Sequence, residues 1–194
     1  MPIARLSFLR GTLVLDGTTR TGIERIFSPA VSAKWEFDPR EGVWRCDAAG
    51  YVDVREELNA RCCGFVDLVP PPPRIEWPRV DLPPLRGDQR AAVDAWRNAN
   101  RGVIVMPTGT GKTEVALAIM AECGVATLVV APVRDLMHQW HRRIHERLGY
   151  DAGVIGDGRH DVRPVSVTTY ESACIHMERL GDRFGLIVFD ECHH

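Results

Sequence analysis

The sequence lacks the features that mark secreted, membrane-spanning or zinc-binding proteins. It has no uncharged apolar run of about 18 residues, and the N-terminus "MPIARLSFLRG" has no long apolar core followed by a small-residue cleavage site. Its six cysteines form no CxxC pair and have no regular spacing, which argues against both a disulfide framework and a set of zinc ligands. We therefore expect a cytoplasmic protein with no membrane association and with reduced thiols.

A strong excess of charge is also missing. With 24 Lys and Arg against 26 Asp and Glu, the net charge is −2, so any contact with nucleic acid has to come from a local patch. Lysine itself is scarce, because Lys34 and Lys112 are the only lysines among those 24 basic residues. A lysine at position 112 therefore suggests a chemical need for that side chain.

Proline is concentrated in one stretch of the chain. Residues 68–84, "LVPPPPRIEWPRVDLPP", hold seven of the 13 prolines, and such a run cannot join a helix or a central strand. It predicts a stiff linker between two domains, with a loop packed across one domain as the alternative.

Residues 1–67 predict a small mixed α/β domain. Apolar and polar residues roughly alternate on either side of Arg10-Gly11 and of residues 38–42, which indicates two strand–turn–strand units. A short helix that ends at Gly64 follows them. The aromatic residues of the strands are expected in the core rather than on a base-stacking surface; they are Trp35, Phe37 and Trp44.

Residues 85–194 predict a doubly wound parallel α/β sheet with helices on both faces. An amphipathic helix up to Gly102 comes first. Four short apolar runs follow, typical of strands buried on both faces, at residues 102–106, 126–132, 164–170 and 184–191. Helical stretches separate them, at residues 113–123, 134–148 and 171–180.

The segment "MPTGTGKT", residues 106–113, lies between a predicted strand and a predicted helix, as a phosphate-binding loop requires. Gly109 and Gly111 allow the backbone to curl so that N–H groups point at phosphate oxygens. Lys112 would neutralise the β- and γ-phosphates of ATP, and the Thr113 hydroxyl would bind Mg²⁺. Met106 stands where the strict pattern has glycine, so the match is to the looser form of the motif.

The run "LIVFDE" supplies acidic residues at the end of a strand. Asp190 is expected at the carboxyl edge of the sheet, where it can hold Mg²⁺, and Glu191 can deprotonate the water that attacks the γ-phosphate. A zinc site formed by Cys192, His193 and His194 is an alternative, although three consecutive residues cannot all face one tetrahedral ion.

These segments resemble the first motor lobe of the XPB-type superfamily-two DNA repair helicases. The similarity is carried by "LRGDQ", "MPTGTGKT", "VVAPVRDLMHQW", "VTTYES" and "FDECHH" in this order, and more weakly by upstream segments that resemble the family's small damage-recognition domain. It implies a RecA-like fold for residues 85–194, interrupted after the DExH box, and a damage-recognition-like domain for residues 1–67.

The resemblance also assigns roles to single residues. It makes Gln89 an adenine-reading residue and puts Arg86 near the nucleotide, although Asp88 stands where the family usually has an aromatic residue. Its phosphate loop consists of Thr108, Gly109, Thr110, Gly111, Lys112 and Thr113, with Lys112 and Glu191 catalytic. Segments after the second and third strands would follow a nucleic-acid strand by its phosphates, through Arg134, Gln139, Thr168 and Thr169.

The resemblance implies an ATP-dependent DNA helicase or translocase that uses ATP and Mg²⁺. Its partner would be single-stranded, forked or damaged DNA, and a repair nuclease would be a further partner. The protein itself is expected to be a monomer. The second lobe, with its arginine fingers, is not within these residues, so we expect nucleotide binding but poor hydrolysis. The motor subunit of a restriction system and a binding module without turnover are the alternatives.

Overall fold

The computed structural model describes residues 3–61, 64–180 and 183–192. The chain forms two compact units: unit 1 contains Met1–Pro71 and Met177–Asp182, and unit 2 contains Pro72–His176 and Arg183–His194. None of the helices in these described stretches is long and apolar enough to cross a membrane.

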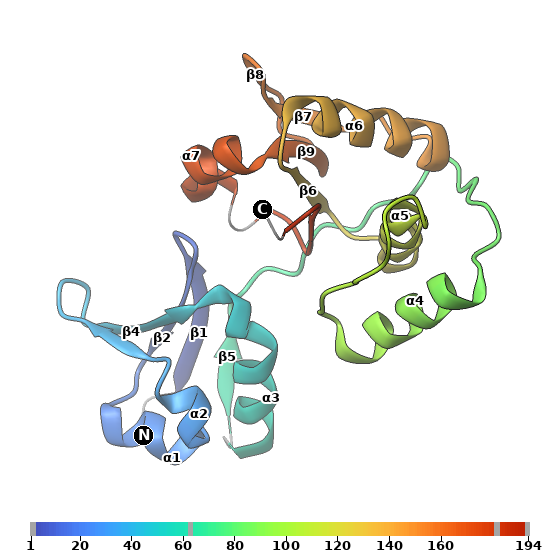
Figure 1. The fold of residues 1–194 in the computed structure, drawn as a ribbon. Coiled ribbons are helices and arrows are strands. Elements are labelled where there is room, and N and C mark those ends of the chain that lie inside the picture. Colours follow the sequence, from blue (N-terminus) through green and yellow to red (C-terminus); the bar gives the residue numbers. More distant parts are fainter. Residues whose placement is uncertain (1–2, 62–63, 181–182, 193–194) are drawn as a thin grey trace. The chain divides into compact units, whose positions relative to one another are not determined.

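Unit 1 is a five-stranded sheet with helices packed against it (Figure 1). The strand order is β3-β4-β2-β1-β5, and all neighbours are antiparallel except β1 and β5. Its elements are β1 (Ala4–Leu9), β2 (Thr12–Asp16), α1 (Arg20–Ile26), α2 (Pro29–Ser32), β3 (Glu36–Asp38), β4 (Val43–Asp47), the 3₁₀ helix η1 (Ala48–Gly50), α3 (Tyr51–Arg61) and β5 (Phe65–Asp67).

The two predicted strand pairs of unit 1 are confirmed. Arg10 and Gly11 both have positive φ, at 50° and 83°, the backbone that a tight turn between antiparallel strands needs. The expected aromatic core is only partly right. Trp35 is 2% exposed, whereas Phe37 is 51% exposed, because it lies on the outermost strand of the sheet. Its ring packs on that of Trp44, at 5.1 Å between ring centroids.

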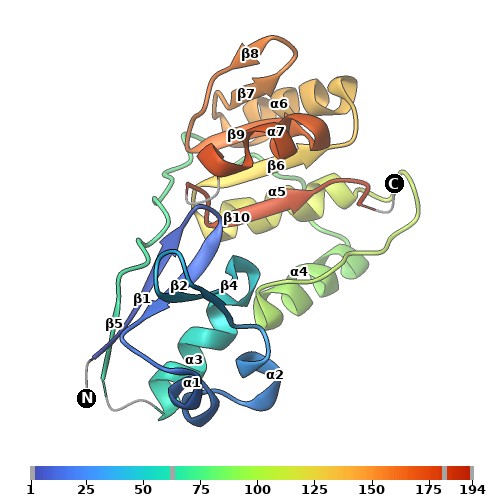
Figure 2. The ribbon, with the colours of Figure 1, turned by 90° about the vertical axis from the view of Figure 1, so that its left-hand side faces the viewer.

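Unit 2 confirms the doubly wound α/β fold. Its strand order is β10-β6-β9-β7-β8, parallel throughout except for the antiparallel pair β7 and β8. Figures 1 and 2 show α5 and α6 on one side of the sheet and the start of α7 on the other. Its elements are α4 (Gly87–Ala99), α5 (Lys112–Cys123), β6 (Thr127–Ala131), α6 (Arg134–Leu148), β7 (Gly153–Gly156), β8 (Arg159–His160), β9 (Val165–Thr169), the first part of α7 (Tyr170–Leu180) and β10 (Leu186–Phe189). The last part of α7, from Met177, is grouped with unit 1.

One predicted strand of unit 2 does not form. Residues 102–106 run without regular secondary structure, and Val103 and Val105 are 75% and 89% exposed. An apolar, β-branched run becomes a strand only where a neighbour supplies the ladder hydrogen bonds, and no strand in the described part of the chain pairs with it. The phosphate-loop segment therefore follows an extended chain rather than a paired strand.

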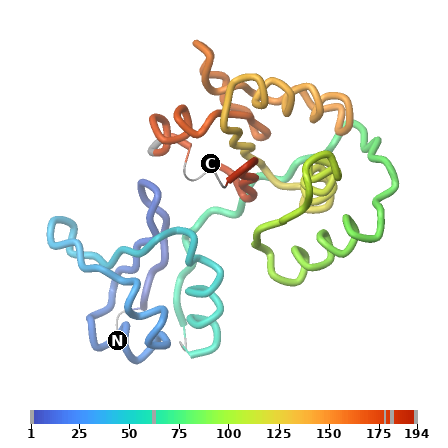
Figure 3. The backbone as a smooth tube through the Cα atoms, viewed as in Figure 1, coloured from blue at the N-terminus to red at the C-terminus, as the bar shows by residue number. Residues whose placement is uncertain are grey.

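The proline-rich segment packs on unit 2 from residue 72 onward. Figure 3 traces the course of the backbone. The N–H of Ile75 donates to the carbonyl of Gly124 at 2.9 Å, and that of Asp81 donates to the carbonyl of Arg147 at 2.8 Å. Ile75, Trp77 and Leu82 pack against the main core of the unit. Proline fits here because the segment needs only scattered backbone hydrogen bonds. The boundary between the compact units thus lies at residues 71 and 72, not across the whole of 68–84.

Candidate functional site

The loop before α5 has the backbone of a phosphate cradle. Gly109 and Gly111 have φ of 77° and 81°, a left-handed conformation that costs residues with a Cβ about 1–2 kcal/mol. Gly111 is also the N-cap of α5, so the first free N–H groups and the positive end of the helix dipole face the same space. This local geometry suits an anion.

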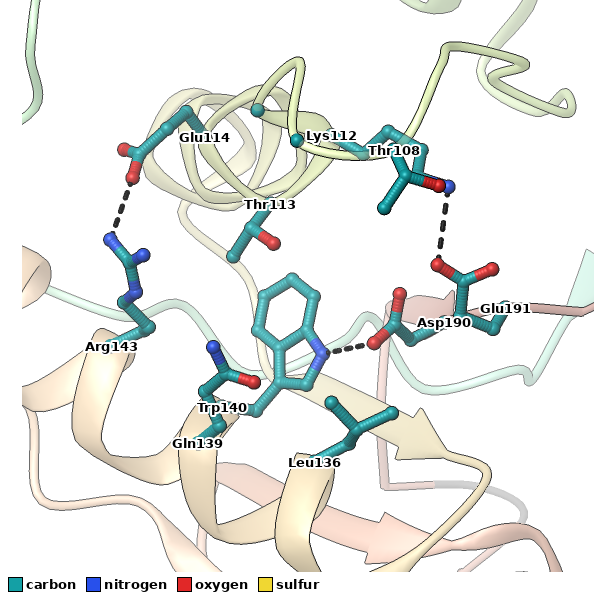
Figure 4. A pocket seen from close by; sticks show the side chains of 12 residues that line it. Thr108, Lys112, Thr113, Glu114, Leu136, Gln139, Trp140, Arg143, Asp190 and Glu191 are labelled. Atoms are coloured by element: carbon teal, nitrogen blue, oxygen red, sulfur yellow. Dashed lines mark hydrogen bonds and ion pairs between the residues drawn. The ribbon is translucent and has the colours of Figure 1, made fainter.

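A cavity of about 250 Å³ opens beside this loop (Figure 4). It brings together the predicted loop residues and the two acidic residues that follow β10, although nearly 80 positions separate them in the sequence. The lining residues are Thr108, Gly109, Gly111, Lys112, Thr113, Glu114, Leu136, Gln139, Trp140, Arg143, Asp190 and Glu191.

The two predicted catalytic groups contact each other. Lys112 Nζ lies 3.1 Å from Glu191 Oε1, and the two side chains are 30% and 27% exposed. Glu191 has φ of 50°, which is uncommon outside glycine and turns the chain sharply after β10. A phosphate that takes Lys112 as its partner has to displace this carboxylate.

Asp190 is held in place from several elements. Its N–H donates to the carbonyl of Val130 on β6 at 2.9 Å, and its Oδ2 accepts from the indole N–H of Trp140 at 2.8 Å. Burial raises the pKa of Tyr170, so its hydroxyl stays protonated and donates to the main-chain carbonyl of Asp190 at 3.1 Å.

The donor set of the cavity fits Mg²⁺ with a nucleotide phosphate. Thr113 and Asp190 offer hydroxyl and carboxylate oxygens, and Mg²⁺ in such sites takes one or two protein ligands and completes its shell with water and phosphate. In the described part of the chain, no three or more His, Cys, Asp or Glu side chains lie close enough together to hold a metal ion by themselves. Cys192 is exposed, while His193 and His194 lie outside the described residues. Zinc at Cys192 therefore gains no support.

Helix α6 supplies one wall of the cavity, which sequence reasoning missed. Leu136, Gln139, Trp140 and Arg143 all line the cavity (Figure 4). Their spacing of three and four residues places them on one face of the helix, so periodicity was the signal that could have found them. Arg143 lies 3.1 Å from Glu114, whose side chain is 14% exposed.

Gln89 is engaged with the phosphate loop in this structure. The side chain is 4% exposed, and its Nε2 donates to the carbonyl of Thr110 at 3.0 Å, while its Oε1 accepts from the N–H of Arg86 at 3.0 Å. The guanidinium of Arg86 also donates to the carbonyl of Thr110. The nitrogen and the oxygen of the Gln89 side-chain amide therefore both have partners within the protein. The adenine-reading role stays a prediction.

The four predicted nucleic-acid contacts fall into different places. Arg134 and Thr169 line one surface depression of about 380 Å³ at the carboxyl ends of β6 and β9. Gln139 lines the phosphate-loop cavity instead. Thr168 is fully buried, and its hydroxyl donates to the carbonyl of Ile155 at 2.8 Å, because every residue of β9 is covered on both faces. Its side chain does not reach a surface where DNA could bind.

Comparison with protein families matches residues 82–194 to the family described as "Type III restriction enzyme, res subunit". The chain belongs to this family. The match begins inside the proline-rich segment that packs on unit 2 and includes the phosphate loop, α6 and the acidic pair after β10.

Curated relatives confirm the resemblance to XPB-type superfamily-two helicases. Over 110 residues, the chain is 49% identical to "DNA 3'-5' translocase XPB2" of Sulfurisphaera tokodaii; the aligned part is 57% of this chain and 25% of that protein. It is 39% identical over 116 residues to "Putative DNA 3'-5' helicase Rad25" of Halobacterium salinarum, with 57% and 19% covered. It is 35% identical over 120 residues to "DNA 3'-5' helicase XPB" of Mycobacterium tuberculosis, with 56% and 22% covered. The aligned part is thus about a quarter or less of these relatives' length.

Proposed function

We propose that this chain is the ATP-binding part of an XPB-type DNA translocase or helicase. The observation that carries the proposal is the cavity in which the glycine-rich loop, Lys112 and Thr113 meet Asp190 and Glu191. A cationic loop at a helix N-terminus opposite an acidic pair is the arrangement that phosphoryl transfer from ATP requires.

The predicted site residues have distinct tasks in this proposal. Lys112 leaves Glu191 and neutralises the β- and γ-phosphates. Thr113 and Asp190 hold Mg²⁺, which supplies charge neutralisation of the phosphate oxygens when bound. Glu191 then accepts a proton from the attacking water. Gln89 and Arg86 keep the loop in its curled shape through the carbonyl of Thr110, and reading of adenine would need one of these contacts to open.

DNA is the proposed polymer partner, because the relatives are named as DNA 3'-5' helicases and translocases. We propose that the full protein moves along DNA in the 3'-5' direction and acts in DNA repair. We also propose that it prefers single-stranded or forked DNA. Arg134 and Thr169, at the carboxyl edge of the sheet, are the proposed phosphate contacts. A monomeric state, a cytoplasmic location and a repair nuclease as partner remain predictions from the sequence.

Efficient hydrolysis is proposed to require more than the 194 residues. An arginine finger is worth about 10³ to 10⁵ in rate, and in this family it comes from a second lobe. The 194-residue chain should therefore bind ATP with Mg²⁺ and hydrolyse it slowly.

Lys112→Ala tests the proposal, measured by the anisotropy of a fluorescent ATP analogue. Loss of the cation that contacts the phosphates should weaken binding at least about tenfold. Lys34→Ala is the matched control, because it removes the other lysine, which lies in unit 1 and pairs with Asp53. Absence of nucleotide binding by the unmodified chain would refute the proposal. If the full-length protein binds ATP but does not hydrolyse it even with single-stranded DNA present, the result would favour a binding module.

A restriction-system motor is the second candidate, because the family description names a restriction enzyme subunit. It would use the same ATP site. A nuclease domain in the full-length protein would favour this candidate, whereas a second lobe bearing arginine fingers and ATPase stimulated by single-stranded DNA would favour the XPB-type motor.

A further inference from the structure

Trp140 is a buried side chain of α6 whose single polar group points at the acidic pair. It is 3% exposed, and its indole N–H donates to Oδ2 of Asp190 at 2.8 Å (Figure 4). Gln139 and Arg143 lie beside it on the same wall of the cavity.

The main chain of Asp190 is fixed independently of Trp140. The N–H group is bonded to the carbonyl of Val130, and the carbonyl is bonded to the hydroxyl of Tyr170. These contacts fix the backbone but leave the carboxylate free to rotate about χ1 and χ2. Within the described part of the chain, the hydrogen bond from Trp140 is the side-chain contact that fixes the direction of the carboxylate.

We propose that Trp140 is a positioning residue that holds the Asp190 carboxylate in its Mg²⁺-binding orientation. The indole occupies Oδ2 and leaves Oδ1 to the ion or to a water of its shell. This inference rests on the proposed function, because it requires that Asp190 binds Mg²⁺ beside a nucleotide.

The indole is chemically suited to this task. It donates one hydrogen bond, accepts none and carries no charge, so it orients the carboxylate without neutralising it. A lysine or arginine at the same place would compete with Mg²⁺ for the negative charge. Since Trp140 is almost fully buried, water cannot readily replace its N–H as the donor.

The test compares the affinity for a fluorescent ATP analogue with Mg²⁺ and with EDTA. In the unmodified chain, Mg²⁺ should tighten binding. In Trp140→Phe, which keeps an aromatic ring but removes the donor, this Mg²⁺ enhancement should fall about tenfold, because a hydrogen bond to a charged group is worth about that factor. The affinity in EDTA reports any loss of packing in the cavity wall separately, and it should fall by a smaller factor than the Mg²⁺ enhancement. An unchanged Mg²⁺ enhancement would overturn the inference.

Two further variants separate positioning from packing. Trp140→3-benzothienylalanine keeps both fused rings and replaces N–H with sulfur, so it should reproduce the loss even if Trp140→Phe fails to fold. Trp77→Phe makes the same change at a tryptophan that packs edge-on against Tyr150, with ring centroids 5.8 Å apart, and lies outside the cavity. It should leave the Mg²⁺ enhancement unchanged, and an equal loss in both tryptophan variants would overturn the inference.

A double-mutant cycle with Asp190→Ala completes the test. If Trp140 acts through Asp190, adding Trp140→Phe to Asp190→Ala should cause no further loss of Mg²⁺ enhancement. Additive losses would contradict the inference but leave the proposed function intact. A wild-type chain that binds no nucleotide would overturn both.

Discussion

Glu191→Gln removes the carboxylate that pairs with Lys112 at 3.1 Å while preserving the shape of the side chain. The two side chains are mostly buried, with exposed fractions of 30% and 27%, so we assign the pair the upper end of the range for partly solvated pairs, about 1 kcal/mol. A nucleotide that recruits Lys112 has to break the pair. The variant should therefore bind ATP about fivefold more tightly than the unmodified chain. Turnover should fall by at least about 100-fold, because a general base contributes about 10² to 10⁴ in rate.

The assay is equilibrium binding of a fluorescent ATP analogue, followed by steady-state phosphate release by the full-length protein with single-stranded DNA. Glu122→Gln is the control: it breaks the ion pair with Arg97, and Glu122 lies at the other end of α5. That variant should change neither affinity nor turnover. Equal or weaker ATP binding by Glu191→Gln would refute the idea that the Lys112–Glu191 pair competes with the nucleotide.

Three further predictions concern the loop, the DNA contact and acid stability. Gly111→Ala should destabilise the chain by about 1–3 kcal/mol in thermal unfolding and weaken ATP binding, because a Cβ there would lie 2.5 Å from Gln89 Nε2; Gly109→Ala, with open space, should cost less. Arg134→Ala should weaken single-stranded DNA binding for all sequences alike and reduce the salt slope by about one. Hydrogen bonds from Ser28 hold the pKa of Glu57 below its ordinary value of 4.5. The stability that these bonds give unit 1 is therefore fully present above pH 4.5 and is lost as pH falls through the lower pKa of the folded state. Urea unfolding at a series of pH values should show this loss in the unmodified chain and not in Glu57→Gln.

The parts of the site that sequence reasoning anticipated are those coded by short, local signals. The two glycines, Lys112 and Thr113 lie within five consecutive positions. The left-handed backbone at Gly109 and Gly111 is one that glycine adopts readily. Asp190 follows a run of apolar residues, which places it at the end of a strand. The rule that ligands bind at the carboxyl edge of open α/β sheets then places Asp190 at the site. The loop lies there as the N-terminal end of α5, not as the end of a paired strand.

The parts that were not anticipated depend on contacts between distant segments. Residues 102–106 have the composition of a buried strand, yet composition cannot say whether a neighbouring strand is present to bond with them. The family resemblance made Thr168 a nucleic-acid contact, but its side chain is fully buried because the sheet is covered on both sides of β9. The sequence also left open whether the proline-rich segment is a linker or a packed loop, because the count of prolines does not show that its few apolar residues reach the core of unit 2.

Several side chains in the cavity and beside it already have partners, and this limits what nucleotide binding can gain. Lys112 is paired with Glu191, Arg143 with Glu114, and the amide of Gln89 with the carbonyl of Thr110. ATP gains Lys112 only by releasing a carboxylate next to its own negative phosphates, so the net affinity is a difference between exchanged contacts rather than their sum. Mg²⁺ offsets that repulsion, because it lies between the phosphates and the acidic residues. We therefore expect nucleotide affinity to depend more steeply on Mg²⁺ than on any single contact to the base.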